Sequence, residues 1–275
     1  MKLIPEWYEH QYCLIAWPCN KDLYGKIINK ARDEVANVIN EIAKTEQVIV
    51  LSNKEDINEI QNKTDHKNID IIECKLDDSW MRDIAPIFYN EDEKLKSISF
   101  EFNGYGKYPD YLNDNKISKF ISNYLNISTK ISDLVIEGGA ITYDDKKNLF
   151  STKNVIFNKN RKQKHNSEYI IKELKLLFDL NYIFLFENGL MEDDTDGHVD
   201  NLLCPIGKNQ YLIATTHKLD PNYEILEKNK ADLIKFFRDT NQTFDLIEVP
   251  LPTRKKINNK NICLLYTSDA ADESV

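Results

Sequence analysis

The sequence lacks the features that mark several classes of protein. No apolar run among its 275 residues approaches the roughly 18 to 20 residues that a membrane-spanning helix needs. The opening stretch "MKLIPEWYEH" turns polar too early for a signal peptide. We therefore expect a cytoplasmic protein that makes no membrane contact.

Paired cysteines and excess positive charge are missing as well. The five cysteines are an odd number without a C-x-x-C pair, so we expect reduced thiols and neither a disulfide nor a zinc framework. The net charge is -9. An acidic chain is a poor partner for nucleic acid and for anionic membranes, whereas it is compatible with a cationic substrate.

No linker or low-complexity tract divides the chain, and a hydrophobic share of 41% suits a globular protein with a sizeable core. We therefore expect one domain over residues 1–262. Within it, the order strand, strand, helix, strand recurs three times at a spacing of about 50 residues, which is typical of a repeat architecture. Its helices have one apolar face, so we expect a mixed α/β fold with helices packed on one side of small sheets.

The pattern predicts each element by range. In the three units, strands are expected at 85–90, 96–102, 133–139, 140–144, 148–152, 182–188, 199–206, 210–215 and 244–252. Helices are expected at 113–125, 167–179 and 221–240, and the N-terminal part should hold strands at 13–18, 47–52 and 69–76 with a helix from about 22 to 44. Polar clusters follow the last strand of successive units, namely "DDSWMRD", "EGG" and "EDDTDGHVD". If the units surround a common axis, these clusters converge on one pocket.

The stretch "DDTDGHVDN" admits three interpretations. A calcium loop needs a bidentate Glu where Leu203 stands. A transition metal could bind His198 and Asp200, but the other histidines stand alone in unrelated contexts. The third interpretation, which we favour, is proton transfer combined with binding of a cation. On a strand starting at His198, His198 and Asp200 would point to the same face.

The other clusters fit that chemistry. Asp83 and Asp200 could pair with a guanidinium, whose planar N–H fork binds carboxylates bidentately. Trp80 could wall the pocket, and Glu137 could orient a histidine, because Gly138 and Gly139 after it permit positive φ or close approach. A rim tryptophan with solvated acids and an ordinary turn with an exposed Glu are the plainer alternatives. The chemistry would also need a nucleophile, usually a cysteine thiolate.

These motifs resemble a known family. The pieces are "AWPCN", "DDSWMRDIAPIF", "EGG" and "DTDGHVDN", and their order and spacing resemble agmatine deiminases and bacterial peptidylarginine deiminases of the guanidine-modifying superfamily. The resemblance covers residues 1 to about 262. It implies a pseudo-fivefold α/β propeller, the pentein fold, and a reaction without cofactor or metal. It also implies a homo-oligomer.

The resemblance implies a role for each residue. Asp83 and Asp200 would bind the guanidinium, His198 would be the general acid and base, and Glu137 would orient it. Trp80 would line the pocket, and Asp194 would contact the far end of the substrate. A C-terminal cysteine would attack the guanidinium carbon and release ammonia, and water would then hydrolyse the covalent amidino intermediate. Agmatine would give N-carbamoylputrescine, on a route to putrescine.

Alternatives remain open. The substrate could be arginine or peptidyl-arginine. From other classes, the chain could be a non-catalytic guanidinium-binding protein or a metal-dependent ureohydrolase.

The C-terminal part departs from the family pattern. The family cysteine lies in a glycine-rich segment, but no glycine follows Gly207 here. The stretch "CLLYTSDAADESV", which begins at Cys263, resembles a translated sequencing adapter. We therefore expect residues 263–275 to be non-native, the last unit to be incomplete and the nucleophile to be absent. Such a chain should be inactive and poorly folded.

Overall fold

Small sheets with flanking helices make up the fold. The computed structural model describes residues 2–65, 67–252, 255–257 and 260–262. Cys263 and the rest of the adapter-like segment lie outside these residues, so the expectations about them stay predictions. Among the residues described, no helix combines the length and the apolar character that crossing a membrane requires.

Three successive units have the predicted order of strand, strand, helix and strand. Their elements are β5 (Ile87–Glu91), β6 (Lys94–Glu101), α5 (Ile117–Tyr124) and β7 (Ser128–Val135); β8 (Thr142–Tyr143), β9 (Asn148–Thr152), α7 (Ser167–Phe178) and β10 (Tyr182–Phe186); and β11 (Leu203–Gly207), β12 (Gln210–Thr215), α8 (Tyr223–Asp239) and β13 (Asp245–Pro250). In each unit the second strand is central, antiparallel to the first and parallel to the third. A short turn suffices for the antiparallel pair, whereas the parallel pair needs the helical crossover.

The N-terminal unit has a parallel sheet with β3 at its centre. Its elements are β2 (Tyr12–Ala16), α2 (Ile28–Ile42), β3 (Gln47–Ser52), α3 (Ile57–Lys63) and β4 (Ile69–Glu73). The single helix predicted from about 22 to 44 is wrong, because α1 (Lys21–Tyr24) ends at Gly25 with φ +52° and a 3-10 turn precedes α2. The short helix α3 was not predicted, since its seven residues are too few to show a clear helical period.

Two further pairs of strands complete the topology. The short β1 (Lys2–Leu3) pairs antiparallel with β5. The segment that follows β1 carries Glu6 to the start of α4 (Met81–Ile84), where it meets Arg82. Near the other end of the chain, β14 (Lys255–Ile257) and β15 (Lys260–Ile262) form an antiparallel pair.

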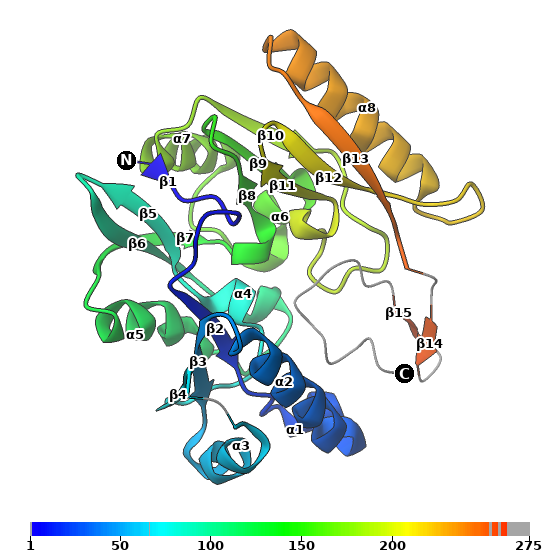
Figure 1. Ribbon diagram of the computed structural model, residues 1–275. Coiled ribbons are helices and arrows are strands. Elements are labelled where there is room, and N and C mark those ends of the chain that lie inside the picture. The colour runs from blue at the N-terminus through cyan, green and yellow to red at the C-terminus, as the bar shows by residue number, and fades with distance from the viewer. Residues whose placement is uncertain (1, 66, 253–254, 258–259, 263–275) are drawn as a thin grey trace.

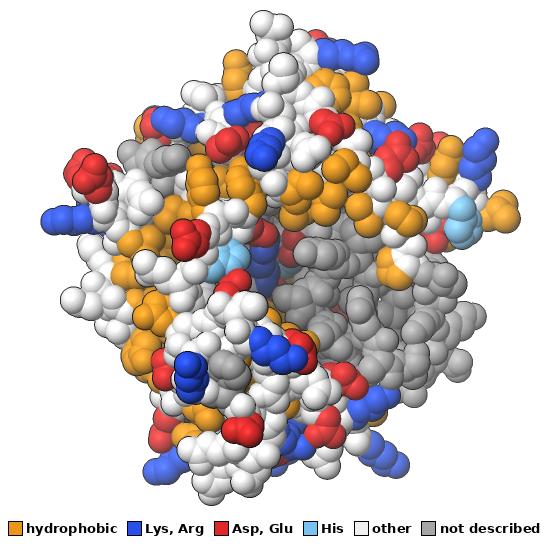
Figure 2. Space-filling model, in the orientation of Figure 1, with side chains coloured by type: hydrophobic (Ala, Val, Ile, Leu, Met, Phe, Trp, Pro, Cys, Tyr) orange, Lys and Arg blue, Asp and Glu red, His pale blue; other side chains and the backbone are white. Residues whose placement is uncertain are grey.

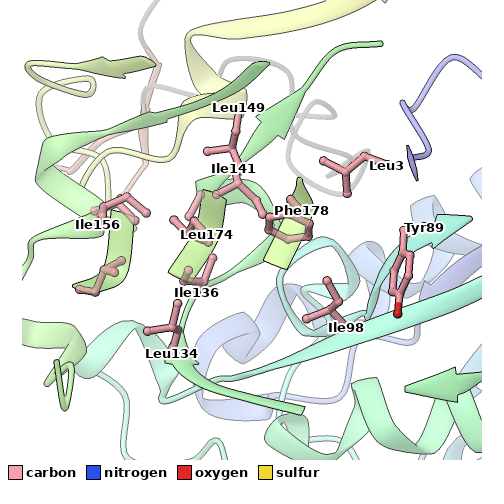
Figure 3. Close-up of a cluster of buried hydrophobic side chains, with 13 residues drawn as sticks. Leu3, Tyr89, Ile98, Leu134, Ile136, Ile141, Leu149, Ile156, Leu174 and Phe178 are labelled. Carbon is pink, nitrogen blue, oxygen red and sulfur yellow. The ribbon is translucent and has the colours of Figure 1, made fainter. Parts of the chain in front are cut away.

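The hydrophobic core fills the space between helices and sheets and joins neighbouring units. In Figure 3, Leu174 and Phe178 of α7 lie in one cluster with Leu134 of β7 and Leu149 of β9. Full burial of such a side chain is worth about 1.5 to 3 kcal/mol, so this cluster fixes two units against each other. Figure 1 shows α5, α7 and α8 at the periphery. On the face drawn in Figure 2, acidic and basic side chains gather near the middle, where the surface is hollowed.

The segments after β4, β7 and β10 meet, as the positions of the polar clusters predict. Helix α4 contacts the 3-10 turn η5 (Gly138–Ala140), and η5 contacts the 3-10 turn η7 (Val199–Asn201). The fold thus brings together residues that lie about 60 positions apart in the sequence.

Candidate active site

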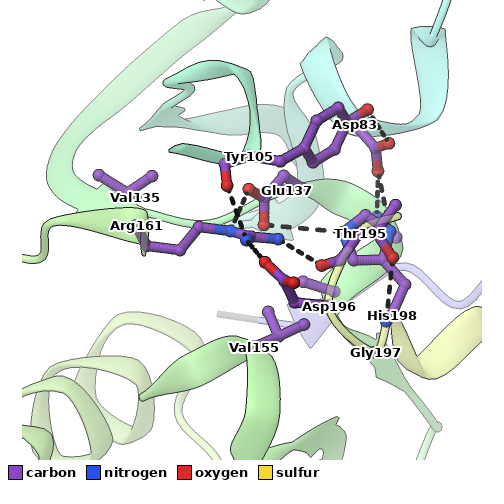
Figure 4. Close-up of polar contacts among 12 residues, drawn as sticks. Asp83, Tyr105, Val135, Glu137, Val155, Arg161, Thr195, Asp196, Gly197 and His198 are labelled. Carbon is purple, nitrogen blue, oxygen red and sulfur yellow. Dashed lines mark hydrogen bonds and ion pairs between the residues drawn. The ribbon is translucent and has the colours of Figure 1, made fainter. Parts of the chain in front are cut away.

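Four of the predicted site residues lie together in the structure. Asp83 is on α4, and Glu137 immediately precedes η5. His198 immediately precedes η7, and Asp200 lies within it. His198 is only 3% exposed and Glu137 is fully buried, so neither fits the alternative of solvated surface charge. Figure 4 shows Asp83 and Glu137 beside His198.

His198 lies between two carboxylates. Its Nδ1 is 3.6 Å from Asp83 Oδ1, and its Nε2 is 3.7 Å from Glu137 Oε2. Burial lowers the pKa of the imidazole, but the negative charges of Asp83, Glu137 and Asp200 outweigh burial and raise the pKa to about 9. The imidazole is therefore protonated at neutral pH. Both contacts are longer than hydrogen bonds, and Nε2 is buried without a hydrogen-bond partner among the described residues.

Glu137 is held on its other side by an arginine. Arg161 Nε lies 2.7 Å from Glu137 Oε1, and neither side chain is exposed. Burial alone would raise the pKa of Glu137, but the imidazole of His198 and the guanidinium of Arg161 hold it below its ordinary value. Glu137 is therefore ionised at neutral pH beside the imidazole.

Each oxygen of Asp83 accepts one hydrogen bond, which leaves further acceptor positions on the carboxylate. Its Oδ1 accepts the N–H of Gly139 at 2.8 Å, and its Oδ2 accepts the hydroxyl of Tyr105 at 2.8 Å. These donors fix the plane of the carboxylate at the base of the site.

Asp200 is the opposite case. Its Oδ1 is buried with no hydrogen-bond partner among the described residues, and its Oδ2 is 3.8 Å from Arg82 Nε. Burial raises the pKa of Asp200 to about 6, and the charges of His198 and Arg82 offset burial only in part. A buried carboxylate oxygen without a donor is costly, unless a ligand supplies the donor.

The two glycines of "EGG" stand where a side chain would have no room. A Cβ on Gly139 would lie 2.5 Å from His198 Nδ1, 2.6 Å from Asp200 Oδ2 and 2.7 Å from Asp83 Oδ1. A Cβ on Gly138 would lie 2.0 Å from the carbonyl oxygen of Arg82. Neither glycine has a positive φ, so close approach is the reason for both. The carboxylates of Asp83 and Asp200 and the imidazole of His198 therefore converge on the same side of Gly139.

The predicted strand starting at His198 is wrong at its beginning. Val199–Asn201 form the 3-10 turn η7, and β11 begins only at Leu203. The carboxylate of Asp193 accepts the backbone N–H groups of Thr195, Gly197 and His198, which holds this loop in a turn. Because a turn replaces the strand, His198 and Asp200 reach the site without sharing a strand face.

Two predicted residues lie outside this cluster. Trp80 is half-buried at the start of α4, and its indole N–H donates to Asp78 Oδ2 at 3.0 Å. Asp194 is exposed, and its carbonyl oxygen accepts from Lys107 Nζ at 2.7 Å. The roles of Trp80 and Asp194 toward a substrate therefore stay predictions.

Sequence reasoning missed three residues of the site, Tyr105, Arg161 and Arg82. Arg161 stands in "NKNRK", which looks like a solvated basic run. Tyr105 stands between Gly104 and Gly106, and these two glycines are the only signal that the sequence offered. Its φ of +57°, which is rare for a residue with a side chain, is seen only in the structure. Arg82 was inside a quoted motif, but its neighbours Glu6 and Asp200 are remote in sequence.

The described cysteines are poor nucleophiles. Cys13, Cys19, Cys74 and Cys204 are free thiols and only half-buried, although the strand context predicted a core position for most of them. Burial raises the pKa of every one, to about 11 for Cys74 and Cys204. At neutral pH such thiols supply little thiolate. Within the part of the chain that the structure describes, no three His, Cys, Asp or Glu side chains are arranged to hold a metal ion.

Comparison with known proteins identifies the family. The model of the Porphyromonas-type peptidyl-arginine deiminase family matches residues 2–268. A relative from Legionella pneumophila, named "Putative agmatine deiminase", is 32% identical over 266 residues, which are 95% of this chain and 76% of the relative. The "Agmatine deiminase" of Pseudomonas aeruginosa is 29% identical over 226 residues, covering 79% of this chain and 61% of the relative.

A solved structure is similar over most of the chain. It is a cysteine-to-serine variant of the C. jejuni agmatine deiminase with substrate bound, and it superposes with a TM-score of 0.87 and 28% identity over 96% of this chain and 78% of that chain. The mixed α/β fold is thus the pentein fold of that structure. From the family match and these likenesses, the chain belongs to the family of Porphyromonas-type peptidyl-arginine deiminases and agmatine deiminases, hydrolases that act on C–N bonds of amidines.

Proposed function

We propose that this chain carries the guanidinium-binding and proton-transfer part of a deiminase site, and that its substrate is agmatine. The observation that carries the proposal is that Asp83 and Asp200 converge at Gly139, beside His198. The buried Oδ1 of Asp200 has no hydrogen-bond donor among the described residues, and a guanidinium supplies several N–H donors in one plane. The agmatine deiminases among the relatives and structures favour agmatine over other guanidines.

The reaction follows from these charges. A cysteine thiolate attacks the guanidinium carbon held by Asp83 and Asp200, which forms a C–S bond. Protonated His198 gives its proton to the departing nitrogen, so ammonia leaves and a covalent amidino intermediate remains on sulfur. Neutral His198 then takes a proton from water, whose oxygen attacks the same carbon. The C–S bond breaks, the thiolate returns and N-carbamoylputrescine is released.

We place the nucleophile outside residues 2–252. The raised pKa values of Cys13, Cys19, Cys74 and Cys204 argue against all four. The substrate-bound cysteine-to-serine variant of the C. jejuni enzyme supports a cysteine in this role. If the 275-residue chain released ammonia from agmatine and Cys263→Ser stopped it, Cys263 would be the nucleophile and not part of an adapter.

A second proposal concerns how the units are arranged in the complete fold. We infer that the units close into a pseudo-fivefold propeller, in which β14 and β15 are the first two strands of a further unit. Their antiparallel pairing matches that of the first two strands in the three units before them. A cytoplasmic location, a step toward putrescine and a homo-oligomeric assembly remain predictions of the same proposal.

The test compares guanidines. Ureido product is measured with agmatine, free arginine and a peptidyl-arginine, on this chain and on the chain continued through its native C-terminal sequence. Turnover of agmatine alone supports the proposal, whereas preference for arginine or its peptides would make the enzyme an arginine or peptidylarginine deiminase. Binding without turnover in both forms would indicate a non-catalytic guanidinium-binding protein. Stoichiometric manganese and loss of activity to a chelator would indicate a ureohydrolase.

A further inference from the structure

Arg161 is the most completely engaged side chain near the site, yet the reaction above gives it no role. It is 0% exposed. Its Nε donates to Glu137 at 2.7 Å, its Nη1 donates to Asp196 Oδ2 at 2.8 Å and its Nη2 donates to the carbonyl oxygen of Thr195 at 2.6 Å. Figure 4 shows the guanidinium between Glu137 and Asp196.

Arg161 also holds Tyr105. Its Nη1 donates to the carbonyl oxygen of Tyr105 at 2.9 Å, and its Cζ lies 5.7 Å from the centroid of the tyrosine ring. The backbone of Tyr105 is in the left-handed region at φ +57°, which a residue with a side chain adopts only when its surroundings enforce it. Arg161 is one such constraint, and it fixes the ring whose hydroxyl donates to Asp83.

These contacts close a ring around the imidazole. Arg161 contacts Glu137, which lies beside Nε2 of His198. Arg161 also contacts Tyr105, which donates to Asp83, and Asp83 lies beside Nδ1 of His198. Both nitrogens of the imidazole are thus aimed by carboxylates that depend on one cation. A planar guanidinium can satisfy this many acceptors in fixed directions, whereas an ammonium cannot.

We propose that Arg161 is a positioning residue, which keeps Glu137 ionised and aimed at His198 and, through Tyr105, orients Asp83. The proposal deepens the proposed function, because it states how the acid–base group of that reaction is held. Arg161 acts through other residues and touches no reacting atom.

The sign of its effect on His198 follows from the geometry. Without Arg161, the buried carboxyl of Glu137 loses its close cation and binds a proton more readily. A neutral Glu137 no longer favours the imidazolium 3.7 Å away. The direct repulsion between Arg161 and His198 is weaker than this lost attraction, because the guanidinium lies behind Glu137. Removing Arg161 therefore makes His198 easier to deprotonate.

The test is the titration of His198, followed by NMR on the 275-residue chain with labelled histidine. His198→Gln identifies the signal among the five histidines. We expect Arg161→Gln to lower the titration midpoint by about one pH unit or more, the effect typical of losing a nearby opposite charge. Arg161→Lys should lower it less, because the charge remains without the fork. The matched control is Asp196→Asn, which removes the other acidic partner of Arg161 and should leave the midpoint unchanged.

The outcomes distinguish a positioning role of Arg161 from a role in stability alone. If both Arg161 variants melt earlier but titrate His198 at the wild-type midpoint, the proposal is overturned. If Arg161→Gln does not fold, Arg161→Lys decides alone, since a lowered midpoint supports the proposal and an unchanged one contradicts it. The measurement needs no substrate. A chain that binds no agmatine but shows the shift would therefore sink the proposed function and leave this inference standing.

Discussion

Two carboxylates border the same histidine and differ in the cation that each one meets. Glu137 is paired with Arg161 at 2.7 Å, and its pKa is held below its ordinary value. In each acid one buried oxygen, Oε2 of Glu137 and Oδ1 of Asp200, has no hydrogen-bond partner among the described residues, so the difference lies in the cations beside them. Asp200 lies 3.8 Å from Arg82, and burial raises its pKa to about 6. The comparison teaches which acid the fold already pairs with a close cation and which can still take one from a ligand.

The largest expected effect is the loss of stability when Glu137 is replaced. Glu137→Gln removes the fully buried partner of Arg161 and leaves the guanidinium with the more exposed Asp196, and we expect a loss of up to about 3 to 5 kcal/mol of unfolding free energy. Denaturant unfolding measures the loss. Asp196→Asn is the matched control, because Asp196 is 20% exposed and its loss should cost clearly less. Equal losses in the two variants would mean that Glu137 is not the principal partner of Arg161.

Asp200→Asn should do the reverse. We expect it to weaken agmatine binding by about 2 to 5 kcal/mol, the usual cost of truncating one partner of a buried charge pair. Its free energy of unfolding should not fall, because the substitution removes a buried negative charge that His198 and Arg82 offset only in part. Calorimetric titration and denaturant unfolding on the same variant provide both numbers. A variant that binds normally but unfolds easily would reverse the assignment of the two acids.

Gly139→Ala tests the space between the acids. A methyl group there meets His198, Asp200 and Asp83 at 2.5 to 2.7 Å, so the three groups must spread. We expect a loss of agmatine affinity worth about 1 to 3 kcal/mol, in the range of overpacking effects. Gly25→Ala is a control for glycine replacement itself, because a Cβ at Gly25 meets nothing within 4 Å, although its φ of +52° adds backbone strain. Unchanged binding in Gly139→Ala would place the ligand elsewhere.

The smallest effect is the dependence of stability on pH. The folded-state pKa of Asp200, about 6, lies above its unfolded value of about 3.9, so its contribution favours folding below pH 3.9 and is lost as pH rises through 6. Wild-type protein should therefore lose stability relative to Asp200→Asn over that window. Glu137 has a lowered pKa and contributes stability above its ordinary value, which is lost as pH falls. A flat difference curve for Asp200→Asn would contradict the raised pKa.

The sequence predicted the order of elements because each unit is encoded locally. The helices α5, α7 and α8 show their apolar period, and the strands between them are short apolar runs, so most of their positions agree with the structure to within a few residues. The strand predicted at 133–139 is wrong at both ends, because β7 spans Ser128–Val135 and Gly138–Ala140 form the 3-10 turn η5. Three of the polar clusters converge because each follows the last strand of its unit. The break at Gly25 and the turn at Val199–Asn201 were missed, since they depend on a single residue and on the side chain of Asp193.

The sequence predicted the acids and the histidine of the candidate site, but it did not predict the arginines beside them. Asp83, Glu137, His198 and Asp200 stand in recognisable motifs, whereas Arg161 and Tyr105 acquire their roles only through contacts across the fold. A buried arginine in a basic run has no local signature. The difference between Glu137 and Asp200 was equally hidden, because it depends on where Arg161 and Arg82 lie in space.

The most direct test of the account is a calorimetric titration of wild type and Asp200→Asn with agmatine and with putrescine. Agmatine and putrescine share a cationic chain, but only agmatine carries the guanidinium. We expect wild-type protein to bind agmatine with a stoichiometry of one and to bind putrescine at least about tenfold more weakly, which corresponds to about 1.4 kcal/mol. Asp200→Asn should remove most of that difference. Equal binding of the two ligands, or an Asp200→Asn variant that still distinguishes them, would contradict a guanidinium site between Asp83 and Asp200.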